Sequence, residues 1–453
     1  MIDSIQKQID FYVRETIRLR CTQNSHLAIS LLPAELLSDV FLYLVEDGLE
    51  SGGAHFATGT FSFLQVCRHW NEVAVGSPQL WALWVTGASK AWPLFKSRSK
   101  DVPVSLTWRP QHNNLSPDAL KDAGTPKRIR QLDFNGTYAQ LENLLGPLDS
   151  TSVSVTSSIR LRGISGKKNG EHLTRFLSLP FPNLSKVDIE DFLPGPSSSI
   201  FITSNLTSLK LDVSYNSGRR YTRSQLLQIL QQHPNLRELE LKDGAIPSTD
   251  KSGTPVPVLL PQLVDLRLYG TEAAIAGFID FVNMSSPLRN VVIGFQYSYS
   301  LLPALTKTIK KVLRAYYECQ GLEYPRKAND LTVSSSLLEN DLSFDAASPS
   351  APAPRPTSNL QLQFVGMVPA FAGEIVSLFP LKHVHKFAVV RTDLGTEGYR
   401  KILQKMKGLS LLRLDGVYFG PVFDALTPND GGVYRELAEI GFNLHPNSWP
   451  DRP

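Results

Sequence analysis

The sequence predicts an α/β protein in which a small helical segment is followed by a solenoid, with parallel strands inside and helices outside. Two observations support this prediction. Apolar residues recur at helical spacing in residues 31–81, and short segments of alternating leucines recur from residue 183 onward. With 453 residues, the chain is long enough for one extended repeat array or for two to three compact domains.

The first 25 residues are predicted to form a helix. Steps of three and four, the spacing of a coiled-coil seam, relate Ile2, Ile5, Ile9, Tyr12, Thr16 and Leu19. The seam is shorter than the three to four heptads, roughly, that indicate a coiled coil. We therefore expect this helix to fold against the segments that follow it, with dimerisation as the alternative.

Residues 26–85 are predicted to hold two short amphipathic helices. Pro33 is expected to be the first residue of the first helix, where its missing N–H costs nothing. The apolar face of this helix is formed by Leu36, Leu37, Val40, Phe41 and Leu44. The second helix, which stops at Gly76 and Pro78, presents Val66, Cys67, Trp70, Val73 and Ala74. The glycine-rich stretch at 45–60 is expected to be a surface loop.

A unit of roughly fifty residues buries only about 60% of its unfolded surface, so apolar side chains are left for a partner. Three ordered motifs, Leu32-Pro33-x-Glu35-x-Leu37, Val66-Cys67-Arg68-x-Trp70 and Pro78-x-Leu80-Trp81, resemble the F-box in the form common in mushroom-forming (basidiomycete) fungi. The resemblance implies docking onto a Skp-type adaptor, and through it onto a cullin. The adaptor-binding residues that it implies are Leu32, Pro33, Leu36, Leu37, Val40, Phe41, Val66, Cys67 and Trp70.

Residues 82–109 connect the helices to the repeats. A strand is predicted at 103–108, where apolar and polar residues alternate. Trp81, Trp84 and Trp92 lie close together in the sequence. We expect them to seal the junction rather than to bind a ligand, because a buried tryptophan supplies a large apolar area.

The remainder, residues 86–453, is predicted to be an irregular leucine-rich-repeat domain. An anchor leucine begins each repeated segment: Leu184, Leu206, Leu236, Leu263 and, more loosely, Leu288. The separations of 22, 30, 27 and 25 residues match leucine-rich repeats of about 20–29 residues. Outer helices are expected at 222–233, 273–282 and 301–317. Weaker strands are expected at 129–134, 159–162, 360–364, 387–390, 411–414 and 437–440.

One insertion interrupts the predicted repeats. Residues 343–358 are rich in proline, serine and alanine. Such a stretch cannot bury enough apolar surface to offset the entropy of ordering the chain, so we predict that it is disordered. A tolerated insertion is the preferred interpretation, and a phosphorylated regulatory loop at Ser348 is the alternative.

Polar residues alternate with the leucines of the repeated strands and are candidates for substrate binding: Lys186, Asp188, Lys210, Asp212, Glu238, Glu240, Asp265 and Arg267. In a stacked array, such positions share one face. An ordinary solvated strand face explains the same pattern equally well.

Composition and motifs exclude several function classes. The net charge is +4, from 46 basic and 42 acidic residues, which argues against a nucleic-acid or membrane partner. Three scattered cysteines indicate a reducing compartment, and no secretory signal or membrane span is recognised, so a cytoplasmic or nuclear location is expected. His383 and His385 lack further metal ligands nearby. We predict no metal, no cofactor and no catalytic residue.

The predicted function is therefore that of a non-catalytic substrate receptor in an SCF-type cullin-RING ubiquitin ligase, with the F-box holding the adaptor and the repeats holding a protein substrate. One alternative is a scaffold protein that mediates protein interactions without ubiquitination. Another is an enzyme whose site is assembled from scattered residues, which a compact pocket with strongly perturbed titratable groups would favour.

Overall fold

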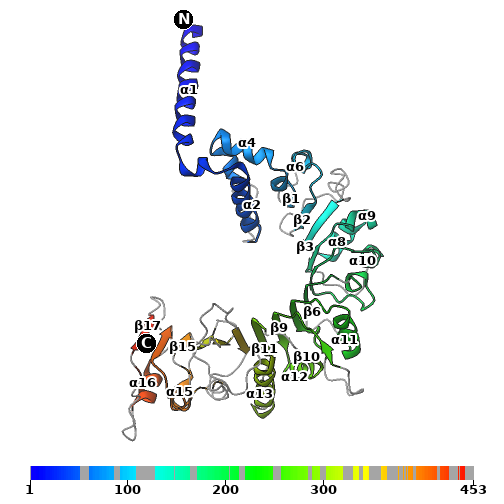
Figure 1. Ribbon diagram of the computed structural model, residues 1–453, viewed down its shortest axis with the longest axis vertical. Coiled ribbons are helices and arrows are strands. Elements are labelled where there is room, and N and C mark those ends of the chain that lie inside the picture. The colour runs from blue at the N-terminus through cyan, green and yellow to red at the C-terminus, as the bar shows by residue number, and fades with distance from the viewer. Residues whose placement is uncertain are drawn as a thin grey trace. The chain divides into compact units, whose positions relative to one another are not determined.

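The computed structural model describes residues 2–50, 61–85, 92–108, 128–146, 148–163, 171–203, 205–213, 220–247, 257–283, 288–295, 302–319, 330–335, 340–345, 359–364, 376, 381, 384, 386–390, 394–415, 419–427, 437 and 439–443. The chain divides into two compact units, Met1–Leu184 and Ser185–Pro453. Each unit combines parallel strands with helices (Figure 1), which confirms the predicted α/β class.

The first unit begins with helices. In chain order they are α1 (Ile2–Ser25), the 3₁₀ turn η1 (Ala28–Leu31), α2 (Ala34–Glu50), the 3₁₀ turn η2 (Ser62–Gln65), α4 (Arg68–Gly76) and α5 (Pro78–Trp81). α4 therefore ends at Gly76, and a second helix, α5, begins at Pro78, which is its first helical residue.

Two predicted boundaries of α2 are corrected. Pro33 precedes the helix rather than beginning it, and its carbonyl accepts a hydrogen bond from the Leu37 N–H at 3.0 Å. The helix also continues through Glu50, so the first part of the stretch predicted as a loop is helical. The reason is Val45, which is fully buried and extends the inward stripe by one more turn. The rest of that stretch, residues 51–60, lies outside the described residues.

The packing predicted for α1 is wrong. None of its 24 residues is buried, so it does not fold against the helices or strands that the structure describes. Its seam stays open to solvent, with Ile2 82% exposed and Leu19 59% exposed.

Three tryptophans join the helices to the first strands. The strands are β1 (Leu83–Val85) and β2 (Val104–Trp108), with α6 (Trp92–Ser99) between them. Trp81, Trp84 and Trp92 are 2%, 1% and 1% exposed, and their indole N–H groups donate to backbone carbonyls at 2.8, 3.1 and 3.1 Å. Their predicted role in sealing the junction is confirmed. Because β1 pairs with β2, the sheet begins inside the range 26–85 predicted for the helical segment.

The sheet of the first unit is parallel, in the order β1, β2, β3 (Ile129–Asn135), β4 (Ser158–Arg162). Three unpredicted helices follow these strands: α8 (Tyr138–Leu145), α9 (Ser150–Val153) and α10 (Glu171–Leu177). Glu142 of α8 accepts from the His172 and Leu173 N–H groups at the start of α10, at 3.0 and 2.8 Å. Arg175 of α10 donates to the Leu145 carbonyl at the end of α8, at 3.3 Å. Neighbouring helices therefore cap one another.

The second unit contains a larger sheet. Its strands, in spatial order, are β5 (Lys186–Glu190), β6 (Ser208–Val213), β7 (Glu238–Asp243), β9 (Asp265–Gly270), β11 (Asn290–Phe295), β14 (Asn359–Phe364), β13 (Asn340–Asp345), β12 (Asp330–Ser335), β15 (Lys386–Val390), β16 (Leu411–Asp415) and β17 (Glu439–Asn443). β13 is antiparallel to both of its neighbours, and the other pairs are parallel. A small separate pair joins β8 (Val258–Leu259) to β10 (Val282–Asn283).

β13 also corrects the predicted insertion, whose first residues, 343–345, are strand and not disordered. The rest of the predicted insertion, residues 346–358, lies outside the described residues, as do His383 and His385.

The helical elements of the second unit follow its strands. They are the 3₁₀ turn η5 (Ser199–Phe201), α11 (Arg223–Gln231), α12 (Glu272–Phe281), α13 (Leu302–Cys319), α15 (Gly395–Leu403) and α16 (Gly420–Leu426). The predicted outer helices correspond to α11, α12 and α13, and α11 begins at a capping box between Thr222 and Gln225. In Figure 1, α11, α12 and α13 lie on the same side of the strands.

The anchor leucines precede the parallel strands from β5 onward; Leu184 is the last residue of the first unit, and the other four belong to the second. Leu184, Leu206, Leu236 and Leu263 have no exposed surface and Leu288 has 1%. From Leu184 to Leu288, each lies two residues before a strand of the parallel run, from β5 to β11. The L-x-x-L-x-L spacing then places the following apolar residues on the buried side of that strand. Each of these segments therefore contributes one buried leucine just before its strand.

We expect His233 to make the stability of this unit depend on pH. It has no exposed surface, and in the described part of the chain neither imidazole nitrogen has a well-formed hydrogen bond. Burial lowers the pKa of His233 below its ordinary value of 6.5, and the nearby Phe201 and Thr203 carbonyls only partly oppose this.

Because the unfolded chain binds a proton at this residue more readily than the folded chain, the stabilisation present above pH 6.5 is lost as the pH falls below it. We expect this histidine to add a loss of up to about 1.4 kcal/mol per pH unit. Urea denaturation at pH 7.5 and 5.5 of the wild type and of His233→Gln measures it. Equal losses in both proteins would contradict the prediction.

Candidate functional site

α2 carries apolar side chains on two faces. On the inner face, Leu37, Phe41 and Val45 follow steps of four and have no exposed surface. The Phe41 ring stacks on Phe63 with 4.3 Å between centroids and lies 5.2 Å from the Trp70 ring. This face forms the core of the helical segment.

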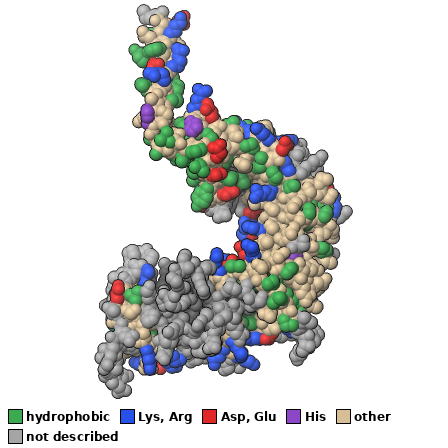
Figure 2. All heavy atoms as spheres, in the orientation of Figure 1, with side chains coloured by type: hydrophobic (Ala, Val, Ile, Leu, Met, Phe, Trp, Pro, Cys, Tyr) green, Lys and Arg blue, Asp and Glu red, His purple; other side chains and the backbone are tan. Residues whose placement is uncertain are grey.

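The other face of α2 is also apolar, and no residue that the structure describes covers it fully. Leu36, Val40, Tyr43 and Leu44 are 52%, 40%, 69% and 48% exposed. We call these four side chains the outer face. Figure 2 shows hydrophobic side chains, in green, gathered near red carboxylates in this part of the first unit. The outer face lies beside the buried face, so α2 carries a broader apolar surface than its own core covers, which is typical of a helix that also packs against a partner.

Cys67 begins α4. Its sulfur accepts the Trp70 N–H at 3.5 Å as an N-cap, and the helix then runs to Gly76. On the solvent side, Arg68 and Glu72 form an ion pair at 2.8 Å. Val66, just before the helix, is 54% exposed. α4 thus supplies core residues and one flanking apolar side chain.

The nine residues predicted to bind an adaptor differ in how far they are exposed to solvent. Exposed are Pro33, Leu36, Val40 and Val66, and half-buried are Leu32, Cys67 and Trp70.

Leu37 and Phe41 are wrong as contact residues, because a side chain with no exposed surface cannot touch a partner while the helices stay folded. Their role is to hold α2 so that the outer face points outward. Tyr43 was missed, and Leu44 was assigned only to the helix's own apolar face. The signal for both was a second stripe at positions 36, 40, 43 and 44.

A polar groove lies between α2 and α4. Its volume is about 630 Å³, and its lining includes Glu35 and Asp39 of α2 and His69 and Glu72 of α4. Three carboxylates beside one imidazole favour a cationic group over an anionic one. No set of three His, Cys, Asp or Glu residues among those described lies close enough to hold a metal ion.

The second candidate surface is the polar side of five neighbouring strands of the second unit. The register aligns its side chains in three rows. The first row is Lys186, Ser208, Glu238, Asp265 and Asn290. The second is Asp188, Lys210, Glu240, Arg267 and Val292, and the third is Glu190, Asp212, Lys242, Tyr269 and Gly294. The eight residues predicted to bind a substrate all fall in these rows, so the structure does bring them together on one face.

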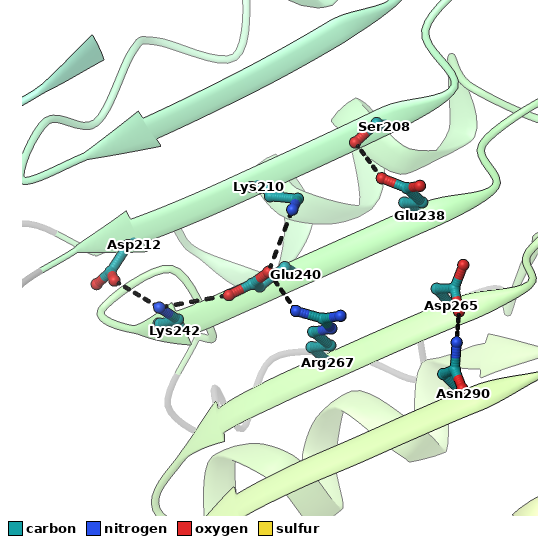
Figure 3. Close-up of polar contacts among 9 residues, drawn as sticks. All are labelled: Ser208, Lys210, Asp212, Glu238, Glu240, Lys242, Asp265, Arg267 and Asn290. Atoms are coloured by element: carbon teal, nitrogen blue, oxygen red, sulfur yellow. Dashed lines mark hydrogen bonds and ion pairs between the residues drawn. The ribbon is translucent and has the colours of Figure 1, made fainter. Parts of the chain in front are cut away.

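Glu240 lies at the centre of this face (Figure 3). Its carboxylate is 3.7 Å from Lys210 Nζ, 3.3 Å from Lys242 Nζ and 3.8 Å from Arg267 Nη1. Its side chain is 14% exposed, against 46% for Arg267. The carboxylate therefore sits low on the face, and the cations around it reach farther into solvent.

Lys242 joins Glu240 to the next row through Asp212, whose carboxylate lies 3.1 Å from Nζ. Burial lowers the pKa of Lys242, but the carboxylates of Asp212 and Glu240 outweigh it and raise the pKa above its ordinary value. Lys242 therefore stays charged at neutral pH and holds the two carboxylates together.

The first row is joined by hydrogen bonds. The Ser208 hydroxyl donates to Glu238 at 2.8 Å, and the Asn290 amide donates to Asp265 (Figure 3). The predicted substrate-binding residues thus pair largely with one another and with their strand neighbours. Exposed pairs of this kind contribute about 0–1 kcal/mol each, so the rows stabilise the face modestly even without a ligand.

The sequence-based list missed an aromatic position on the same face. The Tyr269 ring lies over Gly294, where a Cβ would stand 2.3 Å from the ring, and the Lys242 ammonium is 5.3 Å from the ring centroid. Strand alternation was the signal that could have identified Tyr269, together with Ser208, Lys242 and Asn290. Tyr269 gives the face a flat apolar element among its charges.

Among the helices that the structure describes, none has the length and apolar character needed to cross a lipid bilayer. No protein-family model matches the chain, and no curated protein matches it significantly in sequence. Its function is therefore inferred from the two surfaces above.

Proposed function

We propose that the chain is a non-catalytic substrate receptor of a cullin-RING ubiquitin ligase of the SCF type. Residues 26–81 would be an F-box, and the strands from β3 to β17 would belong to an irregular leucine-rich-repeat solenoid. The observation that carries the proposal is the outer face of α2, an exposed apolar surface on a helix whose neighbouring face already forms a core.

The outer face has the chemistry of a protein-docking site. Fully burying a leucine or valine side chain contributes about 1.5–3 kcal/mol, so Leu36, Val40 and Leu44, together with the Tyr43 ring, could offset much of the cost of association. The exposed carboxylates of Glu35 and Asp39 flank these side chains in the sequence. Apolar side chains with a charged rim are typical of a specific protein interface.

The repeat interpretation is supported by the anchor leucines, the parallel strands and the helices that follow them. Each anchor lies two residues before its strand, and stacking neighbours buries one continuous core. The polar rows on the other side of the strands would then bind a protein substrate, with Arg267 and Tyr269 as contacts. Catalysis would consist of holding that substrate near another enzyme's ubiquitin-transfer site.

The test is binding of the full chain to a purified Skp-type adaptor. We expect the double variant Leu36→Glu, Val40→Glu to bind at least roughly tenfold more weakly, because two carboxylates would be desolvated in the interface. Its circular dichroism should match the wild type, since both side chains are exposed. The matched control is Ile202→Glu, Leu259→Glu, which changes two exposed apolar residues, 62% and 52%, of the second unit.

A wild-type chain that does not bind the adaptor, or two double variants that weaken binding equally, would contradict the proposal. Binding of the adaptor without recruitment of a cullin would instead identify the non-ubiquitinating scaffold.

A further inference from the structure

α1 forms a helix without support from the rest of the described chain. It is 24 residues long and buries none of them, whereas the shorter α11 and α12 each bury four. Its sequence is also a weak helix former by itself, because it is rich in β-branched residues such as Ile5, Val13 and Ile17. Most helices in proteins are stabilised by packing an apolar face, so α1 needs a partner.

The exposed side chains of α1 define what kind of partner fits. The seam positions of Ile5, Ile9, Tyr12 and Leu19 are 51%, 49%, 67% and 59% exposed. Alternating steps of three and four place them along one line of the helix, which is the geometry that packs against a second helix with the same repeat. The nearest source of such a helix is another copy of this chain.

The charges favour a parallel arrangement. With Ile2 and Ile9 at position a of the heptad, Glu15 falls at position g and Arg20 at position e of the next heptad. In a parallel, in-register pair, Glu15 of one helix faces Arg20 of the other, and symmetry makes this pair twice. In an antiparallel pair with the same seam, Glu15 would face Gln8 instead. Glu15 already bonds Arg18 of its own helix at 3.0 Å, and both side chains are exposed enough to rearrange.

A lipid surface is a poorer fit for the same helix. The basic residues Lys7, Arg14 and Arg18 are interspersed with Asp3 and Asp10. An interfacial helix would gather its cations on one polar face without such acids.

We propose that α1 pairs in parallel with α1 of a second copy, so that the chain forms a homodimer. The inference does not depend on the proposed adaptor binding. A dimer would present two outer faces and two strand faces together, and a ligand with two matching sites would bind it more tightly than a single copy by effective concentration.

The experiment measures the mass of the full chain by light scattering over a wide range of concentration. We expect the wild type to reach twice the chain mass. Ile9→Glu, on the seam, should weaken dimerisation roughly tenfold or more, because a carboxylate would be buried between the helices. Ile17→Glu is the matched control, since Ile17 is off the seam on the same helix and is 57% exposed, against 49% for Ile9.

Charge reversal tests the parallel arrangement. Glu15→Arg alone should weaken the dimer, and adding Arg20→Glu should restore it. A wild type that remains monomeric, equal effects of Ile9→Glu and Ile17→Glu, or a charge-swapped variant that is not restored would each overturn the proposal. So would a monomer that binds vesicles of phosphatidylserine and phosphatidylcholine. Adaptor binding is measured separately, so its failure would leave this result unaffected.

Discussion

Replacing Trp81 by alanine is expected to lower the free energy of unfolding of the first unit by about 3–5 kcal/mol. Trp81 is 2% exposed, and its indole N–H donates to the Ala74 carbonyl at 2.8 Å. Its ring contacts Phe61 and Phe95, each with 5.6 Å between centroids, and the Arg98 guanidinium lies 4.3 Å from it. The substitution would therefore leave a cavity, a carbonyl that keeps only the Ser77 N–H at 3.3 Å, and a cation without its aromatic partner.

Urea denaturation followed by circular dichroism measures this loss. The control is Arg98→Ala, which removes the cation but keeps the ring and should cost about 0.5–1 kcal/mol. If Trp81→Ala cost no more than Arg98→Ala, the ring would not be part of the core. Comparing Trp81→Ala with the double variant of the outer face is also informative. The first should weaken adaptor binding by unfolding the helices, and the second should weaken it with the fold intact.

The parallel strands could be predicted because their signal is local. An anchor leucine and the alternation after it are contained in about seven residues, so β5, β6, β7, β9 and β11 follow from the sequence without knowledge of their neighbours. The helices α8 and α10 were missed because they are short. The sign that could have revealed α8 is the capping box formed by Thr137 and Gln140.

β12 and β13 could not be predicted for a different reason. β12 and β13 pair antiparallel with each other, but each also pairs with a strand after the insertion: β12 with β15, where Asp330 lies opposite Lys386, and β13 with β14. Pairing across such separations depends on contacts that no local pattern records. The proline-rich composition that follows predicted an interruption but gave no sign that β13 extends to residue 345.

The sequence predicted which residues of α2 are apolar, but not which of them form the exposed docking surface. Periodicity identified the apolar residues of α2, but it could not distinguish the two faces because both are apolar. The structure distinguishes them by burial, since Leu37 has no exposed surface and Leu36 is 52% exposed. For the polar strand face, the sequence predicted which residues share the face but not which of them pair. Alternation placed Lys210 and Glu240 on it, but their ion pair depends on the register between β6 and β7.

Replacing Leu241 by alanine is expected to cost about 2–5 kcal/mol in the second unit. Leu241 lies in β7, in register with Leu211 of β6 and Leu268 of β9, and all three have no exposed surface. The control is Leu259→Ala, since Leu259 is 52% exposed and its loss should change the stability by no more than about 0.5 kcal/mol.

Hydrogen exchange in the Leu241→Ala variant also tests whether the second unit is a solenoid. In a solenoid each repeat contacts only its neighbours, so stability is close to a sum of repeats and interfaces. A cavity in β7 should then weaken the strands beside it more than the distant β16 and β17. Hydrogen exchange measures this difference: amides of β6, β7 and β9 should lose protection first, while those of β16 change little. Equal loss of protection in all of these strands would indicate one cooperative domain and would argue against the solenoid on which the proposed substrate surface depends.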